Sequence, residues 1–124
     1  MSLNQSRTMA EGLSCTRPEE PTFSIIRRYA DDVVVVTEEE IAHGVQTLLE
    51  YGRLMAEPSG AAAPAALLTG KVPLDGRPTV AVVSGGNMDW PRLAQVMRRR
   101  LPGRLPLRAL GGWTASSPAT AASR

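Results

Sequence analysis

Four consecutive valines at positions 33–36 constrain the fold of this chain more than any other feature. Valine is β-branched and stiff at χ1, so the run favours a strand, and four residues are too few for a helix. No polar residue interrupts the run, which is typical of a strand buried on both faces in a parallel sheet. The run TVAVV at 79–83 has the same character. Together they predict an α/β fold with parallel strands.

Helical patterns precede and follow the valine run. Phe23, Ile26 and Tyr29 recur at every third position and predict a short helix over 22–30 whose arginines face solvent. A second helix is predicted from a capping box, in which the Thr37 hydroxyl and the carboxylate three residues later satisfy backbone donors at a helix start. It ends at Tyr51-Gly52, and one side of it carries an apolar stripe formed by Ile41, Val45, Leu48 and Leu49.

Two further helices are expected in the second half of the chain. The stretch EPSGAAAPAALL at 57–68 reads as a turn that enters an alanine-rich helix closed by Gly70. Its small side chains allow close approach to a neighbour, and Pro64 is tolerated only in the first turn. The last helix is expected to begin near Pro91. The alternation of helices and strands supports an α/β sheet flanked by helices.

Composition excludes several classes of function. The chain has 124 residues, of which 43% are hydrophobic, so it is long enough for one small domain. Aromatic residues make up only 4%, so a nucleic-acid module with stacking platforms is not expected. The single cysteine, Cys15, and the single histidine, His43, exclude an internal disulfide and a Cys/His metal site. With no apolar run long enough to cross a bilayer, we expect a cytoplasmic protein and no membrane partner.

Charge divides the chain into two unequal parts. Residues 1–96 carry all 12 acidic residues, whereas residues 97–124 carry six arginines and no acid. The second part is also rich in proline, glycine, serine and alanine without a sustained period. We therefore expect one folded unit over 1–96 and a basic, disordered tail over 97–124.

The segment SGGN at 84–87 follows the second predicted strand. Two glycines let the backbone turn tightly and let a ligand approach, while Ser84 and Asn87 offer hydrogen bonds to it. The same segment also suits a simple strand-to-helix turn in which Gly85 and Gly86 take positive φ and Asn87 caps the helix. These residues alone leave both readings open.

Four stretches in a fixed order resemble one enzyme family, the threonine dehydratase and serine racemase branch of the tryptophan-synthase-β-like, pyridoxal-phosphate-dependent enzymes. The resemblance is to the carboxy-terminal part of these enzymes and covers residues 8–94. It implies part of a three-layer α/β sandwich, with parallel strands and flanking helices. The stretches are TMAEGL at 8–13, DDVVVVTEEEI at 31–41, EPSGAAAPAALL at 57–68 and VAVVSGGNMD at 80–89.

The resemblance implies a cofactor site for pyridoxal 5'-phosphate. It places Ser84 opposite the pyridine nitrogen of the cofactor, with Gly85 beside it, and brings Glu57 and Gly12 close to the ring. A neutral hydroxyl does not hold a proton on that nitrogen as an aspartate does, which favours elimination of a β-hydroxyl over transamination. Glu57 has a simpler reading as an acid at a helix amino terminus, and Gly12 as a turn residue.

The lysine that binds the cofactor in this family lies in a Ser-x-Lys motif, and a glycine-rich loop grips the phosphate; neither motif occurs in the 124 residues. The sole lysine, Lys71, lies in a polar connection and is expected to be solvated surface. Cys15 has no evident base, and His43 is expected to be exposed opposite the apolar stripe. We therefore assign no catalytic residue and expect the chain to be inactive alone.

Two functions follow from the resemblance. The first is a fragment of a dehydratase that removes water from a hydroxy amino acid and gives a 2-oxo acid and ammonia. Because buried strands need neighbours, it would require a complementing amino-terminal segment or a homo-oligomer. The second is a non-catalytic interaction or regulatory protein derived from the same fold. The residues leave open which hydroxy amino acid the first would use.

Overall fold

The computed structural model describes residues 7–15, 17 and 19–99, and over this range it contains helices and no β-strand. Within the described range, no helix is long and apolar enough to cross a membrane. In chain order the elements are η1 Glu11–Leu13, α1 Glu20–Tyr29, α2 Glu38–Gly52, η2 Ser59–Ala61, α3 Ala62–Leu68 and α4 Trp90–Arg98.

Helix α2 begins at the predicted capping box. The Glu40 amide donates to the Thr37 hydroxyl over 3.2 Å, and the Thr37 amide donates to Glu40 Oε2 over 2.6 Å. The helix ends at Gly52, where Arg53 takes a left-handed conformation with φ +54°. Start and end are thus both confirmed.

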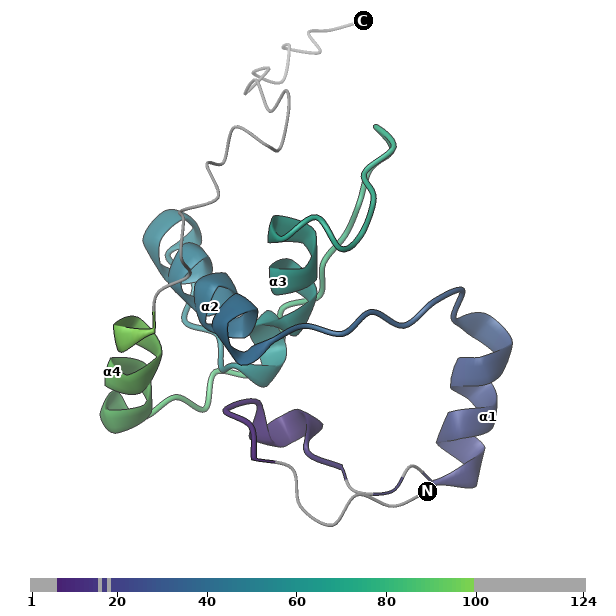
Figure 1. Cartoon of the computed structure of the whole chain (residues 1–124), viewed down its shortest axis with the longest axis horizontal. Helices are drawn as coiled ribbons and strands as arrows, with labels where there is room; N and C mark the ends of the chain where they lie inside the picture. Colours follow the sequence, from purple (N-terminus) through teal and green to yellow (C-terminus); the bar gives the residue numbers. More distant parts are fainter. Residues whose placement is uncertain (1–6, 16, 18, 100–124) are drawn as a thin grey trace, which may run out of the picture.

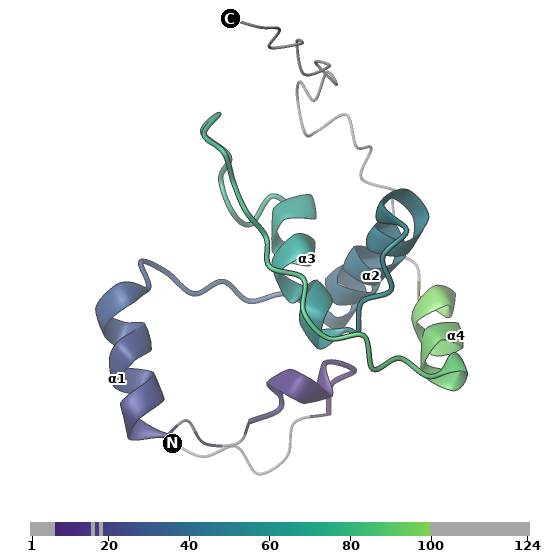
Figure 2. The same cartoon turned by 180° about the vertical axis from the view of Figure 1, so that it is seen from behind.

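Helices α2, α3 and α4 pack together around a small core (Figures 1 and 2). Val45 of α2 and Val96 of α4 are each 1% exposed, and Ala61 at the start of α3 is fully buried. A Cβ added to Gly44 would lie 2.9 Å from the carbonyl oxygen of Ala61, so α2 and the η2–α3 segment touch through backbone. The close approach predicted from the alanine-rich stretch is confirmed, and Pro64 lies in the first turn of α3 as expected.

Helix α4 starts at Trp90 with Asp89 as its cap, since Asp89 Oδ1 accepts a hydrogen bond from the Arg92 amide over 2.8 Å. Asn87, the cap considered above, is not the capping residue. The Gln46 side chain of α2 donates to the carbonyl oxygens of Val96 and Arg99 over 2.8 and 2.7 Å and holds the far end of α4. Helix α4 also continues two residues past the predicted boundary at 96, and the predicted disorder from 100 onward lies outside the described residues.

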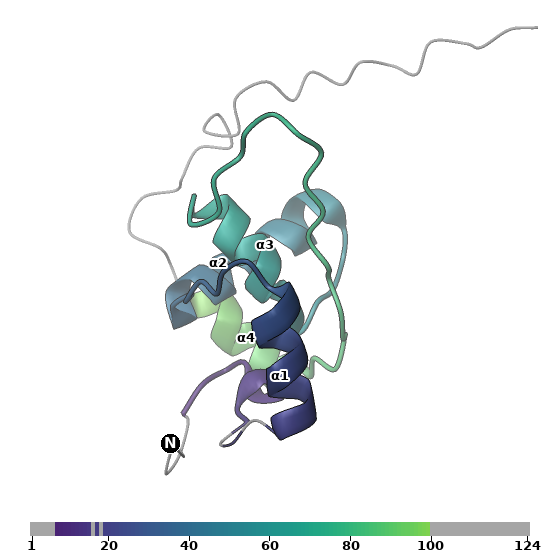
Figure 3. The same ribbon diagram turned by 90° about the vertical axis from the view of Figure 1, so that its right-hand side faces the viewer.

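The structure corrects the two predicted strands. Residues 33–36 and 79–83 are extended, but neither pairs with another segment in the described part of the chain. The valines alternate in exposure: Val33 and Val35 are 74% and 79% exposed, whereas Val34 is 40% exposed and Val36 is half-buried. A strand needs hydrogen bonds from neighbouring strands. An apolar, β-branched run without such neighbours therefore stays extended, with its backbone unpaired and its side chains exposed. Figure 3 shows residues 79–83 in the long connection between α3 and α4.

Helix α1 forms where the sequence predicts it but buries none of its residues. Phe23, Ile26 and Tyr29 remain 40%, 46% and 72% exposed. In Figures 1 and 2 the helix stands apart from the α2–α3–α4 core. The predicted apolar side is therefore present, but no other segment of the described residues packs against it.

The structure also corrects the expectations for His43 and Lys71. His43 is half-buried, and its Nδ1 atom is shielded from solvent without a partner among the described residues, because the buried side of α2 is widened by Ala42 and Gly44. Lys71 is not a free surface lysine: its Nζ lies 2.8 Å from Glu40 Oε2 and donates to the carbonyl oxygen of Val35 over 2.6 Å.

The Lys71–Glu40 pair predicts a pH-dependent stability. Partial burial raises the pKa of the Glu40 carboxyl, but hydrogen bonds from the Lys71 ammonium and the Thr37 amide outweigh it, so the pKa lies below its ordinary value of 4.5. The stabilisation is therefore complete above pH 4.5 and is lost as the pH falls through the lower pKa of the folded state. We expect Lys71→Met to lower the free energy of unfolding by up to about 1 kcal/mol at pH 7.

Urea unfolding of both proteins between pH 7 and pH 3 measures this difference, which we expect to become smaller as the pH falls, because only the hydrogen bond from Lys71 to the Val35 carbonyl oxygen is independent of Glu40 ionisation. Arg77→Met is the matched control, because the Arg77–Asp75 pair is 85% and 54% exposed and contributes little. An equal loss in the two variants, or a loss that is the same at pH 7 and pH 3, would contradict the assignment.

Candidate functional site

Glu57 and Gly85, both predicted site residues, are in direct contact. The Glu57 amide donates to the Gly85 carbonyl oxygen over 3.1 Å, and the Asn87 amide donates to Glu57 Oε2 over 3.3 Å. Gly85 has φ +73°, and a Cβ added there would lie 2.5 Å from Glu57 Cδ. Both the left-handed backbone and the carboxylate therefore require glycine at this position.

Gly12 approaches the same carboxylate from a distant part of the sequence. The Gly12 amide donates to Ser59 Oγ over 2.9 Å. A Cβ added to Gly12 would lie 2.8 Å from Ser59 Oγ and 3.5 Å from Glu57 Oε1. The Glu57 side chain thus lies within reach of both Gly12 and Gly85, and the site is formed by three separate stretches of the chain.

Ser84 joins the site through its backbone contact with Gly60. A Cβ added to Gly60 would lie 1.6 Å from the Ser84 carbonyl oxygen, so any side chain at position 60 would overlap the Ser84 backbone. The sequence analysis did not single out Ser59 or Gly60. The signal available for them was the serine–glycine pair after Glu57-Pro58, where small residues mark a close approach of two segments.

The Ser84 side chain is exposed, and its hydroxyl takes part in none of the hydrogen bonds among the described residues. It is a neutral group that both donates and accepts. Beside it lie the Gly85 backbone and, through Gly85, the Glu57 carboxylate. This arrangement suits a flat ligand with a polar ring atom, because Ser84 and Gly85 are both exposed and the hydroxyl supplies a directional hydrogen bond.

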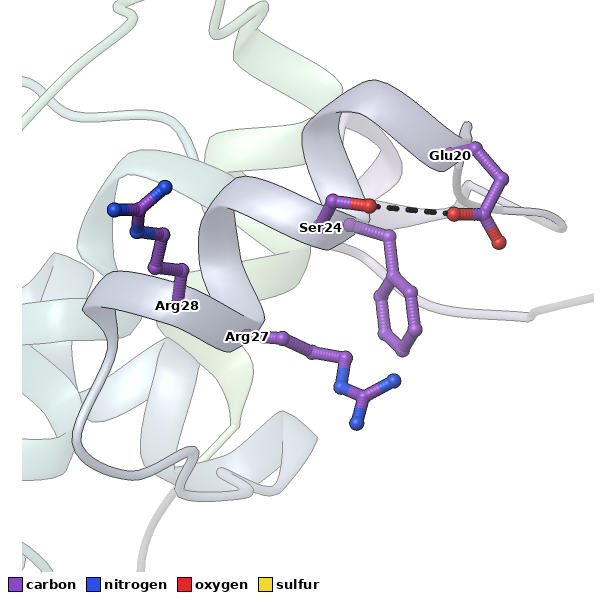
Figure 4. A pocket seen from close by; sticks show the side chains of 5 residues that line it. Glu20, Ser24, Arg27 and Arg28 are labelled. Carbon is purple, nitrogen blue, oxygen red and sulfur yellow. Dashed lines mark hydrogen bonds between the residues drawn. The ribbon is translucent and has the colours of Figure 1, made fainter.

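A hollow elsewhere on the chain is not part of this site. It has a volume of about 320 Å³ and is lined only by α1 side chains, which point apart in Figure 4. The one hydrogen bond drawn there joins the Ser24 hydroxyl to Glu20 over 3.3 Å. All the walls of this hollow come from the exposed helix α1. None of the predicted site residues lines it.

The chain is similar in sequence to known proteins of one enzyme family. The family model described as "Pyridoxal-phosphate dependent enzyme" matches residues 2–85. L-threonine dehydratase catabolic TdcB of Escherichia coli K12 is 40% identical over 91 residues, which are 72% of this chain and 28% of that protein. TdcB of Staphylococcus aureus N315 is 36% identical over 78% of this chain and 29% of that protein. L-threonine ammonia-lyase of Thermotoga maritima is 36% identical over 76% of this chain and 23% of that protein.

The chain belongs to the family of pyridoxal-phosphate-dependent enzymes. Within that family it is similar to part of several threonine dehydratases, which confirms the resemblance of the four stretches described above. It spans less than a third of the length of the curated relatives it matches. The family implies an α/β fold, whereas the described residues contribute only helices and extended segments.

The site residues fit one part of the family's cofactor. The unbonded, neutral hydroxyl of Ser84 suits the pyridine nitrogen, and Gly85 and Gly12 are exposed on the sides that Glu57 and Ser59 do not fill, so a ring can approach them there. A phosphate is not accommodated here, because the Glu57 carboxylate would repel it and the amides of Gly12 and Asn87 already donate to Ser59 and Glu57.

The chain's one lysine does not reach this site. Lys71 follows the carboxyl end of α3 and is held by Glu40 and the Val35 carbonyl oxygen. The site lies at the other end of the η2–α3 segment, and ten residues of helical rise place the two ends roughly 15 Å apart. The expectation that Lys71 is not the cofactor-binding lysine is therefore consistent with its position.

Proposed function

We propose that this chain contributes the cofactor-ring side of a dehydratase that acts on threonine or serine, and that it does not complete the reaction alone. The observation that carries the proposal is the convergence of Gly12 and Gly85 on the Glu57 carboxylate, next to the Ser84 backbone that packs against Gly60. These are the positions that the family resemblance assigns to the cofactor. Glu57 is positioned by two backbone contacts rather than left free at a helix start.

When bound, pyridoxal phosphate would supply the electron-withdrawing group that lets a β-hydroxyl leave as water; hydrolysis of the resulting imine by a water molecule would then give the 2-oxo acid and ammonia. Ser84 hydrogen-bonds the ring nitrogen without holding a proton on it, because a hydroxyl carries no charge to stabilise the protonated form. Gly85 and Gly12 let the ring approach the backbone, and the Asn87 amide orients the Glu57 carboxylate toward the site. No residue of this chain is assigned to proton removal from the substrate.

A complementing amino-terminal segment supplies the cofactor-binding lysine and the phosphate loop in this proposal. The exposed valines support it: Val33, Val35, Val80 and Val82 are 71% to 86% exposed, although a β-branched apolar run is suited to a buried sheet. Neighbouring strands would convert both segments into strands of a three-layer sandwich. The proposal takes 1–96 as the dehydratase unit, 97–124 as a basic tail and the cytoplasm as its location.

The test is to produce this chain alone and together with the remaining part of a threonine dehydratase such as the E. coli relative. We expect no 2-oxo acid from threonine or serine with the chain alone. The complex is expected to show visible absorbance of bound pyridoxal phosphate, greater strand content by circular dichroism and 2-oxo acid formation. Ser84→Ala in the complex is expected to shift that absorbance and to lower activity, because the ring nitrogen loses its hydrogen bond.

Activity of the chain alone, removed by Lys71→Ala, would overturn the proposal. Cofactor binding by the complex that is indifferent to Ser84→Ala and Gly85→Ala would overturn the assignment of the site. Gly86→Ala is the matched control, because a Cβ at Gly86 makes only one contact of 3.4 Å, with the Met55 carbonyl oxygen.

A second candidate is a non-catalytic interaction protein. The exposed apolar side of α1, with Phe23, Ile26 and Tyr29, favours it, because such a surface is suited to a partner. This function predicts a stable, monodisperse chain that binds no pyridoxal phosphate even in the presence of the complementing segment.

A further inference from the structure

The segment of residues 8–13 is held in place almost entirely by side chains from other elements. Along the chain, it is joined to α2 only through residues 14–37, which include α1, and α1 has no buried residue. A connection of this length places little restriction on where its ends lie. Yet η1 contacts η2, which leads into α3, and it lies near the start of α2 in Figures 1 and 2. Non-covalent contacts must therefore determine where Gly12 lies.

Glu38, the first residue of α2, makes the principal contact. Its Oε1 accepts a hydrogen bond from the Thr8 hydroxyl, and its Oε2 accepts one from the Met9 amide over 2.9 Å. Thr8 Oγ1 in turn accepts from the Ala10 amide over 3.0 Å, and Ala10 is 2% exposed. One half-buried carboxylate thus fixes two consecutive residues, and a third is fixed through Thr8. Hydrogen bonds to a charged acceptor are stronger than neutral ones.

The Met9 side chain also packs against the core, and two weaker polar contacts complete the attachment. Arg92 of α4 forms an ion pair with Glu11, whose side chain is 64% exposed, and exposed pairs contribute little. The Gly12 amide donates to Ser59 Oγ, a bond between neutral groups at an exposed position. Neither contact restrains the start of the segment as the Glu38 carboxylate does.

We propose that Glu38 is a positioning residue of the cofactor site. Its carboxylate holds the 8–13 segment so that Gly12 stays against Ser59 and Glu57 and closes one wall of the site. The identity of the ligand in this inference rests on the proposed function, whereas the positioning rests on the hydrogen bonds alone. Glu38 acts through Gly12 and does not contact the reacting atoms.

Amide hydrogen exchange on the full chain tests the positioning in Glu38→Gln and Thr8→Val. Glutamine removes the charge that strengthens both hydrogen bonds and keeps only one acceptor oxygen, and valine removes the Thr8 hydroxyl at nearly constant shape. We expect the amides of Met9 and Gly12 to exchange roughly tenfold faster in both variants, while that of Val45 in α2 is unchanged. Glu39→Gln is the matched control, because it removes an adjacent charge from the same helical turn.

The second measurement is the affinity of the complemented protein for pyridoxal phosphate, which we expect to weaken by a similar factor in both variants and not in Glu39→Gln. Unchanged exchange at Gly12, or equal acceleration in Glu39→Gln, would overturn the inference. If Glu38→Gln unfolds, Thr8→Val decides, since it leaves α2 intact. A further outcome separates the two proposals. If the variants exchange faster at Gly12 but the unmodified complex binds no pyridoxal phosphate, the positioning by Glu38 is supported and the proposed function is refuted.

Discussion

Gly60→Ala is expected to separate the Ser84 segment from the start of α3 and to destabilise the chain severely. The new Cβ would lie 1.6 Å from the Ser84 carbonyl oxygen and 3.2 Å from its amide nitrogen. Both are backbone atoms, which cannot rotate aside as a side chain can, so one segment has to move. Gly60 is buried, and the shift would extend to Ala61 in the core. We expect a loss of about 3 kcal/mol in the free energy of unfolding.

Chemical denaturation of Gly60→Ala and of the unmodified chain measures this loss. A second readout is specific to the site: in the complemented protein, pyridoxal phosphate binding is expected to fall below detection, because Ser84 and Gly85 no longer lie beside Glu57. Gly86→Ala, one residue beyond the site glycine, serves as the control and is expected to change the stability by less than about 0.5 kcal/mol. Equal stability of Gly60→Ala and the unmodified chain would show that Gly60 does not pack against the Ser84 backbone.

Gly44→Leu has the second largest expected effect, because it pushes α2 and α3 apart. Position 44 faces the Ala61 carbonyl oxygen at 2.9 Å and Ala65 Cβ at 3.1 Å from an added Cβ. Leucine extends three carbons beyond that Cβ into a contact already closed by backbone. Overpacking of this kind costs about 1 to 3 kcal/mol, and the higher helix propensity of leucine recovers under 1 kcal/mol of it.

Thermal unfolding compares Gly44→Leu with Gly52→Ala at the end of the same helix. An added Cβ at Gly52 meets only Leu54 carbons at 3.7 Å or more, so we expect its midpoint to be unchanged or slightly raised. Gly44→Leu is expected to lower the midpoint by several degrees. A midpoint for Gly44→Leu at or above that of Gly52→Ala would exclude the close α2–α3 contact.

Features that depend on neighbouring residues could be predicted from the sequence. The capping box of Thr37 and Glu40 involves residues three positions apart, and both of its hydrogen bonds are present. The same holds for the helix over 20–29 and for Pro64 in a first helical turn. The family was also predictable, because four short motifs keep their order and distances along the chain.

Features that depend on distant residues could not be predicted in this way. The valine runs contain the residues of a strand, but a strand also needs partners, and the described residues supply none. The pairing of Lys71 with Glu40 and the half-burial of His43 follow from how α2 and α3 pack. No spacing within a single helix indicates them.

The candidate site shows the same division between features set by neighbouring residues and features set by distant ones. By itself, the sequence determined which family the chain belongs to and named Gly12, Glu57, Ser84 and Gly85 through their motifs. Only the tertiary structure decided that Glu57 meets Gly85, that Gly60 must lack a side chain beside Ser84, and that Glu38 holds the Gly12 segment. The physical reason is that clearance for a Cβ and the acceptor of a hydrogen bond are set by atoms some 25 to 50 residues away, which no local pattern records.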